Sequence, residues 1–342
     1  MKKDKIIAII LMLCLSVIII IYFRNSDGKN IFSNKGIIRD GFYFDTYIKI
    51  TIYDCKENSN ATKDFDTILK EAIDICAKYE KICSPTNPQS ELYILNNNPE
   101  FLNGNDVNLS ISLEDIIYKT EEISLPFQDK FSIYSGDLCA LWDFSKKIIP
   151  SNELLETTLK DFNNVSTNSR ITLGATAKGY IADKVAEYFK TVGINEALID
   201  LGGNILVIGD KYDDSLYGIG IKKPFDDNSK PICAIKVKDK SVVTSGIYER
   251  YFEENNKIYH HIIDTSTGYP VENDILSVTI IADSSLVADC YSTGFILIGK
   301  NNALEIANKK HYEDVECIII DKDYNIHLSN GLKKDGDYIT LK

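Results

Sequence analysis

The sequence has too few basic residues for a protein whose main partner is nucleic acid. Its 38 Lys and Arg residues are outnumbered by 50 Asp and Glu, and the net charge is −12. Binding to duplex nucleic acid needs a cationic surface, which this balance does not supply. Internal repeats and low-complexity tracts are also absent, and the hydrophobic content of 44% is that of an ordinary globular protein. Solenoid and disordered classes are therefore disfavoured, whereas an anionic ligand at a local cationic site is still allowed.

Cysteine is present, but its spacing does not indicate a disulfide framework. The eight cysteines include no Cys-x-x-Cys pair, and Cys14 lies in an apolar N-terminal run. The other seven are scattered along the chain and odd in number. We therefore expect buried free thiols, although an extracellular chain could oxidise one pair.

The N-terminal residues predict a membrane anchor. Residues 6–23 are almost unbroken Ile, Leu, Val and Met, and Lys2, Lys3 and Lys5 precede them. A helix of this length, at about 1.5 Å per residue, just crosses the core of a bilayer. No Ala-x-Ala site follows the run, and the residues before Cys14 lack the small side chain that lipoprotein processing usually requires. An uncleaved anchor is therefore favoured over a cleaved signal.

We divide the chain into a membrane segment, a polar linker and one large domain. The linker begins with Arg, Asn, Ser, Asp and Gly residues, which are typical of a flexible connection. The expected boundaries are 1–23 for the anchor or signal segment, 24–36 for the linker and 37–342 for the domain. The basic residues before the anchor favour a cytoplasmic N-terminus, which places the domain outside the cytoplasm at the cell membrane.

The periodicity of apolar residues predicts a mixture of strands and helices. Residues 42–53 alternate like a half-buried strand, whereas 64–83 and 110–124 have helical spacing, with Ser112 as the N-cap of the second helix. Further strands are expected at 197–208, broken by a Gly-Gly-Asn turn, and at 217–222, 232–237, 241–244, 275–281, 315–320 and 325–328. Further helices are expected after the turn at 174–179 and at 286–298. Because no regular βαβ rhythm appears, we expect an α+β fold with a mixed, largely antiparallel sheet and packed helices.

The turn at residues 174–179 is rich in glycine and alanine and opens an amphipathic helix that carries Lys178. Small side chains let a ligand approach the backbone, and the N-terminal end of a helix attracts phosphate. Lys178 would add a positive charge. A tight turn with a solvated lysine explains the same residues, so this segment alone does not establish a phosphate site.

Asp289 and Thr293 are four residues apart on one expected helix and therefore share a face. A carboxylate and a hydroxyl together suit a hard cation such as Mg²⁺. An ordinary polar contact of the Asp and a back-bonded Thr would explain the pair equally well.

Histidine is scarce, yet two of the four histidines stand side by side at the end of a strand-like run. The second, His261, precedes Ile262, Ile263 and Asp264. Histidine is the side chain most often used as an acid or base near neutral pH. A structural histidine at a strand end is the competing interpretation.

Five short motifs occur in a fixed order along the chain. They are Gly-Ala-x-Ala-Lys-Gly-Tyr at 174–180, Leu-Gly-Gly-Asn at 201–204, Thr-Ser-Gly-x-Tyr at 244–248, His-Ile-Ile-Asp-x-x-Thr-Gly-Tyr-Pro at 261–270 and Ala-Asp-x-x-Ser-Thr at 288–293. In this order and spacing they closely resemble the ApbE family of FAD:protein FMN transferases. The resemblance covers nearly all of the chain after the linker.

The resemblance implies an enzyme that binds FAD, uses Mg²⁺ to split its pyrophosphate and attaches FMN through a phosphoester to a threonine of another protein, with release of AMP. Asp289 and Thr293 would bind the metal through their side chains, and Ala175 through its backbone carbonyl. Lys178 would contact FAD and take part in catalysis, and His261 would act near the attacking threonine. The positions that line the flavin nucleotide in the family correspond to Phe44, Thr86, Lys130, Phe131, Ser132, Lys178 and Ile262.

Three residues depart from the family pattern. Thr172 and Ser132 stand where the family usually has Asp, and Thr265 replaces a usual proline. The lost carboxylates could weaken ligand positioning or change the flavin preference, whereas the effect of Thr265 is expected to be mild.

The chain contains no Asp-Gly-x-Thr segment of the kind that the family modifies. We therefore expect the acceptor to be another protein with such an exposed motif, for which the family expectation is a redox protein on the outer face of the membrane. Two alternatives use the same site: a hydrolase that cuts FAD to FMN and AMP, and a non-catalytic flavin-binding protein. A membrane-anchored module for other ligands would leave the ordered motifs as a coincidence.

Overall fold

The part of the chain that can be described is the large domain. A computed structural model describes residues 36–342 except 103–104, 106, 128, 165–168, 212–214, 227–229 and 310–312. The expected anchor and most of the expected linker lie outside the described residues. Within the described ranges, no helix is both long enough and apolar enough to cross a bilayer. The membrane anchor therefore stays a prediction.

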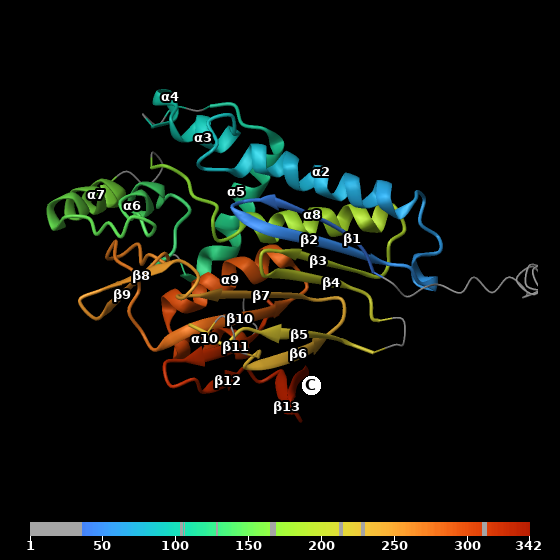
Figure 1. The fold of residues 1–342 in the computed structure, drawn as a ribbon. Coiled ribbons are helices and arrows are strands. Elements are labelled where there is room, and N and C mark those ends of the chain that lie inside the picture. The colour runs from blue at the N-terminus through green and yellow to red at the C-terminus, as the bar shows by residue number, and fades with distance from the viewer. Residues whose placement is uncertain are drawn as a thin grey trace, which may run out of the picture.

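The centre of the fold is an eight-stranded sheet in which every pair of neighbouring strands is antiparallel. Its order is β1-β2-β3-β4-β7-β10-β11-β12 (Figure 1). The strands are β1 Gly36–Tyr43, β2 Thr46–Tyr53, β3 Ala197–Leu201, β4 Asn204–Ile208, β7 Ser241–Gly246, β10 Ile275–Ala282, β11 Glu316–Asp321 and β12 Ile326–Leu328.

A smaller sheet covers one face of the central strands. Its strands, in the order β13-β14-β6-β5, are β13 Leu332–Asp335, β14 Tyr338–Leu341, β6 Cys233–Val237 and β5 Tyr217–Ile221. Only the β14–β6 pair in this sheet is parallel. Val242 and Ile318 of the large sheet pack against Ile219 and Ile235 of the small one. The strands β8 Tyr251–Glu254 and β9 Lys257–His260 form a separate hairpin.

Helices cover the opposite face of the large sheet (Figure 1). The helices are α2 Phe65–Cys83, α3 Glu91–Asn96, α4 Pro99–Leu102, α5 Ile111–Ser124, α6 Gly136–Ala140, α7 Asn152–Asn164, α8 Ala177–Thr191, α9 Ser285–Ile298 and α10 Lys300–Lys309, with single 3-10 turns at Lys56–Asn58 and Leu125–Phe127. Ile50 of β2 and Val185 of α8 are fully buried in one core, and Val278 of β10 and Phe295 of α9 in another. The expected α+β fold with a largely antiparallel sheet is confirmed.

Two local predictions are wrong. Residues 42–53 are not one strand, because the chain turns at Phe44 and Asp45 between β1 and β2. Both residues have positive φ, 55° and 56°, so the alternating pattern crosses a tight hairpin turn. The N-cap of α5 is Ser110 rather than Ser112, since the Ser110 hydroxyl accepts the Leu113 N–H at 3.2 Å.

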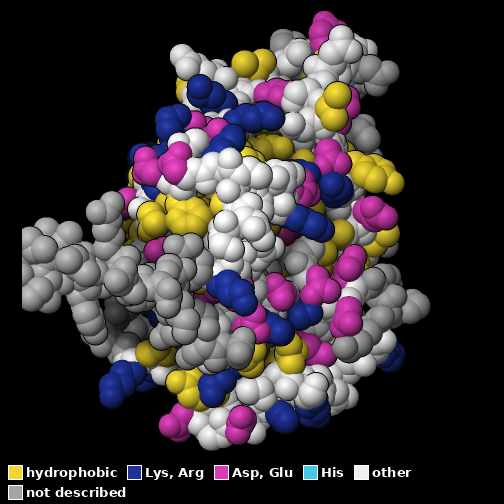
Figure 2. Space-filling view, turned by 90° about the vertical axis from the view of Figure 1, so that its right-hand side faces the viewer, with side chains coloured by type: hydrophobic (Ala, Val, Ile, Leu, Met, Phe, Trp, Pro, Cys, Tyr) yellow, Lys and Arg dark blue, Asp and Glu magenta, His cyan; other side chains and the backbone are white. Residues whose placement is uncertain are grey.

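The surface of the domain mixes charges of both signs. On the described part of the face in Figure 2, Lys and Arg side chains are interspersed with Asp and Glu. This face therefore offers no continuous cationic surface of the kind that nucleic acid binding requires.

Candidate active site

The site is built where α8 and α9 cross. The two helices meet at Gly179, where a Cβ atom would lie 2.2 Å from the backbone oxygen of Ser285 and 2.8 Å from the Cβ of Asp289. Only glycine permits this approach. It brings the Gly179 N–H to 2.9 Å from Oδ2 of Asp289, whose side chain is 3% exposed. The buried carboxylate thus lies beside the first turn of α8, the positive end of that helix.

A second, partly buried carboxylate fixes the start of α9. Asp183 of α8 accepts hydrogen bonds from the backbone N–H groups of Ser285 and Leu286 at 2.7 and 3.0 Å. Its Oδ2 also accepts the Ser284 hydroxyl at 2.7 Å. Burial raises the pKa of Asp183, although these donors oppose the shift. These bonds from α8 fix where α9 begins and therefore where Asp289 lies.

Thr293 lies one helical turn beyond Asp289, beside the end of β7. Its hydroxyl is 3.2 Å from Oγ of Ser245, which is also 2.7 Å from Oγ of Ser292. Among the residues that the structure describes, no donor pairs with the second oxygen of Asp289. Ala175 lies in the turn that leads into α8. A carboxylate, a hydroxyl and a backbone carbonyl form a donor set that fits Mg²⁺.

The turn after β7 adds an acid that the sequence analysis did not assign. Glu249 is open to solvent, but protein atoms crowd its carboxyl, and this desolvation raises the pKa of Glu249 to about 7. The negative charge of Asp289 raises this pKa further, while Lys178 and Lys222 oppose the shift. Glu249 thus shares an electrostatic environment with Asp289 and Lys178. It directly follows the Thr-Ser-Gly-x-Tyr motif at 244–248, but nothing in the sequence indicates that its carboxyl is affected by charges on α8 and α9.

The two adjacent histidines have different roles. His260 is buried, its Nε2 lies 3.0 Å from the carbonyl of Val271, and its Nδ1 accepts the Ile262 N–H. This pattern assigns the proton to Nε2 and makes His260 structural. His261 bonds through its backbone to the carbonyl of Arg250 at 3.1 Å, and within the described chain its buried Nδ1 has no hydrogen-bond partner.

The imidazole of His261 is neutral at physiological pH. Desolvation lowers the pKa of His261 to about 4, and the positive charges of Arg250 and Lys178 act in the same direction. Lys178 contributes to the pKa shifts of both His261 and Glu249, so its charge acts on both side chains. A neutral imidazole with a nitrogen not used by the protein can accept a proton.

The segment that holds Lys130 is fastened to the turn after His261. Nζ of Lys130 lies 2.7 Å from Oδ2 of the buried Asp264, and the Lys130 carbonyl accepts the Thr265 N–H at 3.1 Å. Phe131 is half-buried against the core, and Ser132 accepts the Tyr134 N–H at 3.1 Å. Lys130 to Ser132 therefore lie beside the His261 turn.

The two positions without the usual acid are close in the fold. The Thr172 N–H donates to the carbonyl of Ile133 at 2.7 Å, so the strand-like segment before α8 runs beside Ser132. Any effect of the two missing carboxylates should therefore act on the same region of the structure.

Three of the expected flavin-lining residues, Phe44, Thr86 and Ile262, have no hydrogen bond to Lys178 within the described part of the chain. Phe44 in the β1–β2 turn and the exposed Thr86 both lie near the C-terminal end of α2. Ile262 is 3% exposed and packs into the core, and its backbone N–H and carbonyl bond to His260 and Val271. Ile262 is thus part of the support for His261 rather than an open wall.

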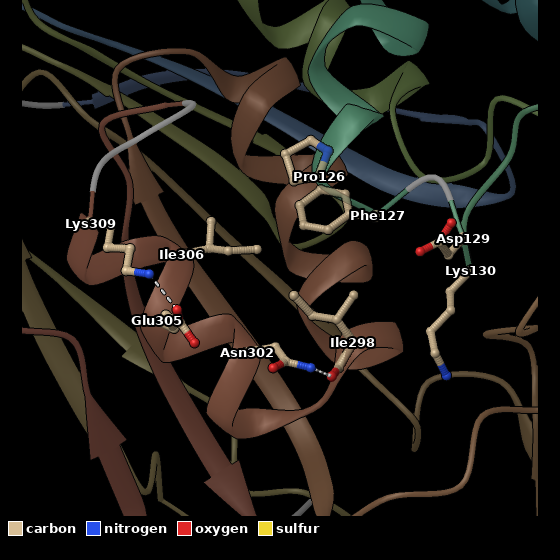
Figure 3. A pocket seen from close by; sticks show the side chains of 9 residues that line it. All are labelled: Pro126, Phe127, Asp129, Lys130, Ile298, Asn302, Glu305, Ile306 and Lys309. Atoms are coloured by element: carbon tan, nitrogen blue, oxygen red, sulfur yellow. Dashed lines mark hydrogen bonds and ion pairs between the residues drawn. The ribbon is translucent and has the colours of Figure 1, made fainter.

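A groove of about 450 Å³ lies on another side of α9 (Figure 3). Its lining consists of Pro126, Phe127, Asp129, Lys130, Ile298, Asn302, Glu305, Ile306 and Lys309. Lys130 is shared with the expected flavin positions, but Asp289 and His261 are not among the lining residues. The groove is therefore not the place where the expected catalytic groups gather.

Residues 44–319 match the sequence profile of the ApbE family. This chain belongs to the ApbE family. A relative from Klebsiella pneumoniae, named FAD:protein FMN transferase, is 30% identical over 281 residues, which cover 78% of this chain and 85% of the relative. A protein of the same name from Treponema pallidum is 29% identical over 297 residues, covering 77% and 80%.

Solved structures of ApbE proteins have the same fold. The ApbE protein of Thermotoga maritima superposes with a TM-score of 0.75 at 26% identity and covers 86% of this chain and 97% of its own. The flavin transferase ApbE of Vibrio cholerae gives 0.74 at 22% identity, with 86% and 97% covered. The family resemblance seen in the motifs is thereby confirmed, and the assignment of individual site residues stays a prediction.

Proposed function

We propose that this ApbE-family enzyme transfers FMN from FAD to a threonine of an acceptor protein, in a Mg²⁺-dependent reaction that releases AMP. The observation that carries the proposal is the buried Asp289 at the α8–α9 crossing, where it accepts the N–H of Gly179, the residue that follows Lys178. The relatives that match most of this chain, over most of their own length, are named FAD:protein FMN transferases. Attack on a pyrophosphate depends mainly on charge neutralisation and positioning, which this group of residues can supply.

Asp289, Thr293 and the carbonyl of Ala175 are the residues proposed to hold the metal. When bound, Mg²⁺ would offset the negative charge of the pyrophosphate. Lys178 adds a fixed positive charge on the same side, at the start of α8.

His261 is proposed to accept the proton of the attacking hydroxyl. A threonine is a weak nucleophile until a base takes its proton. The threonine oxygen forms a bond to the FMN phosphorus, the bond from that phosphorus to the bridging oxygen breaks, and AMP leaves with the bridging oxygen. The proton passes to His261. Because its imidazole is neutral at pH 7, it is ready to act as the base.

The test is an FMN transfer assay with two active-site variants. The full-length chain is incubated with FAD, Mg²⁺ and a peptide with an Asp-Gly-x-Thr segment, and the peptide mass and AMP are measured. We expect the peptide to gain one FMN less one water. Asp289→Asn should reduce transfer to background, and His261→Ala should reduce it by a factor of about a hundred or more.

A matched control is available just before α9. Asp283 is an exposed carboxylate that pairs with Lys240, and Asp283→Asn should transfer FMN at the wild-type rate. AMP without a modified peptide would favour the hydrolase. Bound FAD without AMP would favour the flavin-binding protein and direct attention to Thr172 and Ser132.

We also propose that residues 1–23 anchor the enzyme, so that the domain acts on the outer face of the membrane on an acceptor located there. The apolar run at 6–23 and the three lysines before it support this placement. Protease added to intact cells with a permeable cell wall should digest the domain. Protection of the domain until the membrane is lysed would contradict the placement.

A further inference from the structure

The turn between β1 and β2 has an unusual backbone for its sequence. Phe44 and Asp45 both occupy the left-handed region, with φ of 55° and 56°. Hairpins with two such residues normally use Asn-Gly or a similar pair, because a side chain with a Cβ is disfavoured there. A bulky aromatic residue with positive φ is an outlier. Such a conformation persists only where the surrounding structure enforces it.

One constraint on the turn comes from α2. Oε1 of Glu80 accepts the backbone N–H of Phe44 at 3.0 Å in a partly buried position. The Glu80 carbonyl accepts the Ser84 N–H at 3.0 Å, and Ser84 leads into the loop that carries Thr86. Glu80 therefore lies at the junction between the two expected flavin positions that come from this end of the sheet. In Figure 1 the β1–β2 hairpin passes beneath α2, as this contact requires.

A second constraint comes from the Leu-Gly-Gly-Asn motif, for which the proposed reaction provides no role. Gly202 lies in the β3–β4 turn with φ of 67°, and a Cβ there would lie 2.2 Å from Oγ1 of Thr46 and 2.8 Å from its Cβ. Thr46 is the residue that follows the Phe44–Asp45 turn. Gly202 thus lets the β3–β4 turn pack closely against the end of the β1–β2 turn.

We propose that Glu80 is a positioning residue for FAD: by holding the Phe44 amide, it fixes the left-handed β1–β2 turn as a rigid wall of the flavin site. The inference rests on the proposed function, in which Phe44 lines the nucleotide. A wall that is already in its bound conformation loses less entropy when the ligand binds. Glu80 is expected to act on FAD affinity and not on the chemical step.

The experiment compares Glu80→Ala and Glu80→Gln in the full-length chain, using flavin fluorescence for the FAD Kd and the transfer assay for KM and kcat. Glu80→Ala should raise the Kd and KM for FAD about tenfold, while kcat at saturating FAD changes less than about twofold. Glu80→Gln keeps an oxygen acceptor and should stay within about threefold of wild type. Asp239→Ala is the matched control, because Asp239 accepts the Gly209 N–H in a turn on another part of the fold.

A second variant tests the turn conformation itself. Glycine relieves the strain of positive φ, so Asp45→Gly added to Glu80→Ala should recover most of the lost FAD affinity. Unchanged FAD affinity in Glu80→Ala, or a loss confined to kcat, would overturn the inference. Failure of Asp45→Gly to restore binding in a folded double variant would overturn it as well. If the wild type binds FAD but does not transfer FMN, the proposed function fails while the Kd comparison still tests Glu80.

Discussion

Residue 179 is a glycine, with a hydrogen atom in place of a side chain, and this allows α8 and α9 to approach closely. Gly179 faces backbone atoms of Ser285, which cannot swing aside as a flexible side chain would. The same residue donates its N–H to Asp289. The packing of the helices and the placement of the expected metal ligand therefore depend on one position.

Gly179→Ala is expected to damage both stability and activity. The added methyl group should push α9 away and lower the free energy of unfolding by about 1–3 kcal/mol. FMN transfer should fall at least about tenfold, because the Asp289 carboxylate moves with α9. Urea unfolding and the transfer assay measure the two effects. Gly218→Ala is the control, since a Cβ there would meet only Tyr338 at an ordinary 3.5 Å; equal behaviour of the two variants would contradict the close-packing argument.

At this scale the sequence predicts residue types better than residue partners. The spacing of Asp289 and Thr293 correctly places them on one face of one helix. Their partners Gly179 and Ser245 lie far away in the sequence, so no local pattern could reveal them. Glu249 was missed for the same reason, because its pKa is raised mainly by desolvation in the folded protein, and the charges that modify the shift, Lys178 and Asp289, are far away in the sequence.

Among the secondary-structure elements, α9 is unusual because its start is held from outside. Ser284 caps the helix by accepting the Val287 N–H, and Asp183 of α8 accepts two more backbone N–H groups there. The N-terminal N–H groups of a helix have no partner within it, so these bonds satisfy donors that would otherwise be buried unpaired. The contact between α8 and α9 therefore includes hydrogen bonds as well as close packing.

Asp183→Ala should destabilise the domain more than Asp183→Asn does. The alanine variant leaves buried N–H groups without an acceptor, at a cost of about 1–3 kcal/mol, whereas asparagine retains one carbonyl oxygen. Thermal unfolding of the two variants provides the comparison. Equal unfolding midpoints for Asp183→Ala, Asp183→Asn and wild type would show that the contact between α8 and α9 does not depend on these bonds.

The elements that the sequence did not predict were those controlled by turns or by tertiary contacts. The β1–β2 hairpin has Phe44-Asp45 instead of a glycine-containing turn, so its alternating pattern predicted one strand. The β8–β9 hairpin turns at Asn255 and Asn256, both with positive φ, and Asn is the residue type that tolerates this conformation best after glycine. That Asn-Asn pair was the signal that could have identified it. The helix α10 begins directly after Gly299, where the expected helix 286–298 ends, and was not predicted.

At the scale of the whole molecule, the buried ionisable groups and thiols affect the conditions under which the fold is stable. Every cysteine in the described part of the chain is a free thiol, as expected. The domain is therefore held together by its cores and not by cross-links. The stability of the domain depends on pH because the domain contains buried ionisable groups.

His260 should make the domain less stable in mild acid. Burial lowers the pKa of His260 to about 4, below its ordinary value of 6.5. The unfolded chain therefore takes up a proton that the folded one does not, so stability is fully present above about pH 6.5 and is lost as the pH falls toward about 4. In His260→Gln, the slope of unfolding free energy against pH in this window should decrease by up to about 1.4 kcal/mol per pH unit.

The difference between the two proteins isolates His260. Other shifted groups are common to both, including Glu249, whose raised pKa acts in the opposite direction. Chemical unfolding at several pH values between 4.5 and 7 gives the slopes. Equal slopes of unfolding free energy against pH for His260→Gln and wild type would show that His260 already titrates normally in the folded protein.

The parallel pairing of β14 with β6 has a consequence for synthesis of the protein. The β5–β6 pair is made first, and the strand that covers its β6 edge, Tyr338–Leu341, is made much later. Until then β6 presents unpaired backbone groups that another chain can join. A nascent chain stalled before β14 would therefore carry a small sheet with an open edge at β6, and would be prone to aggregate until β14 is made.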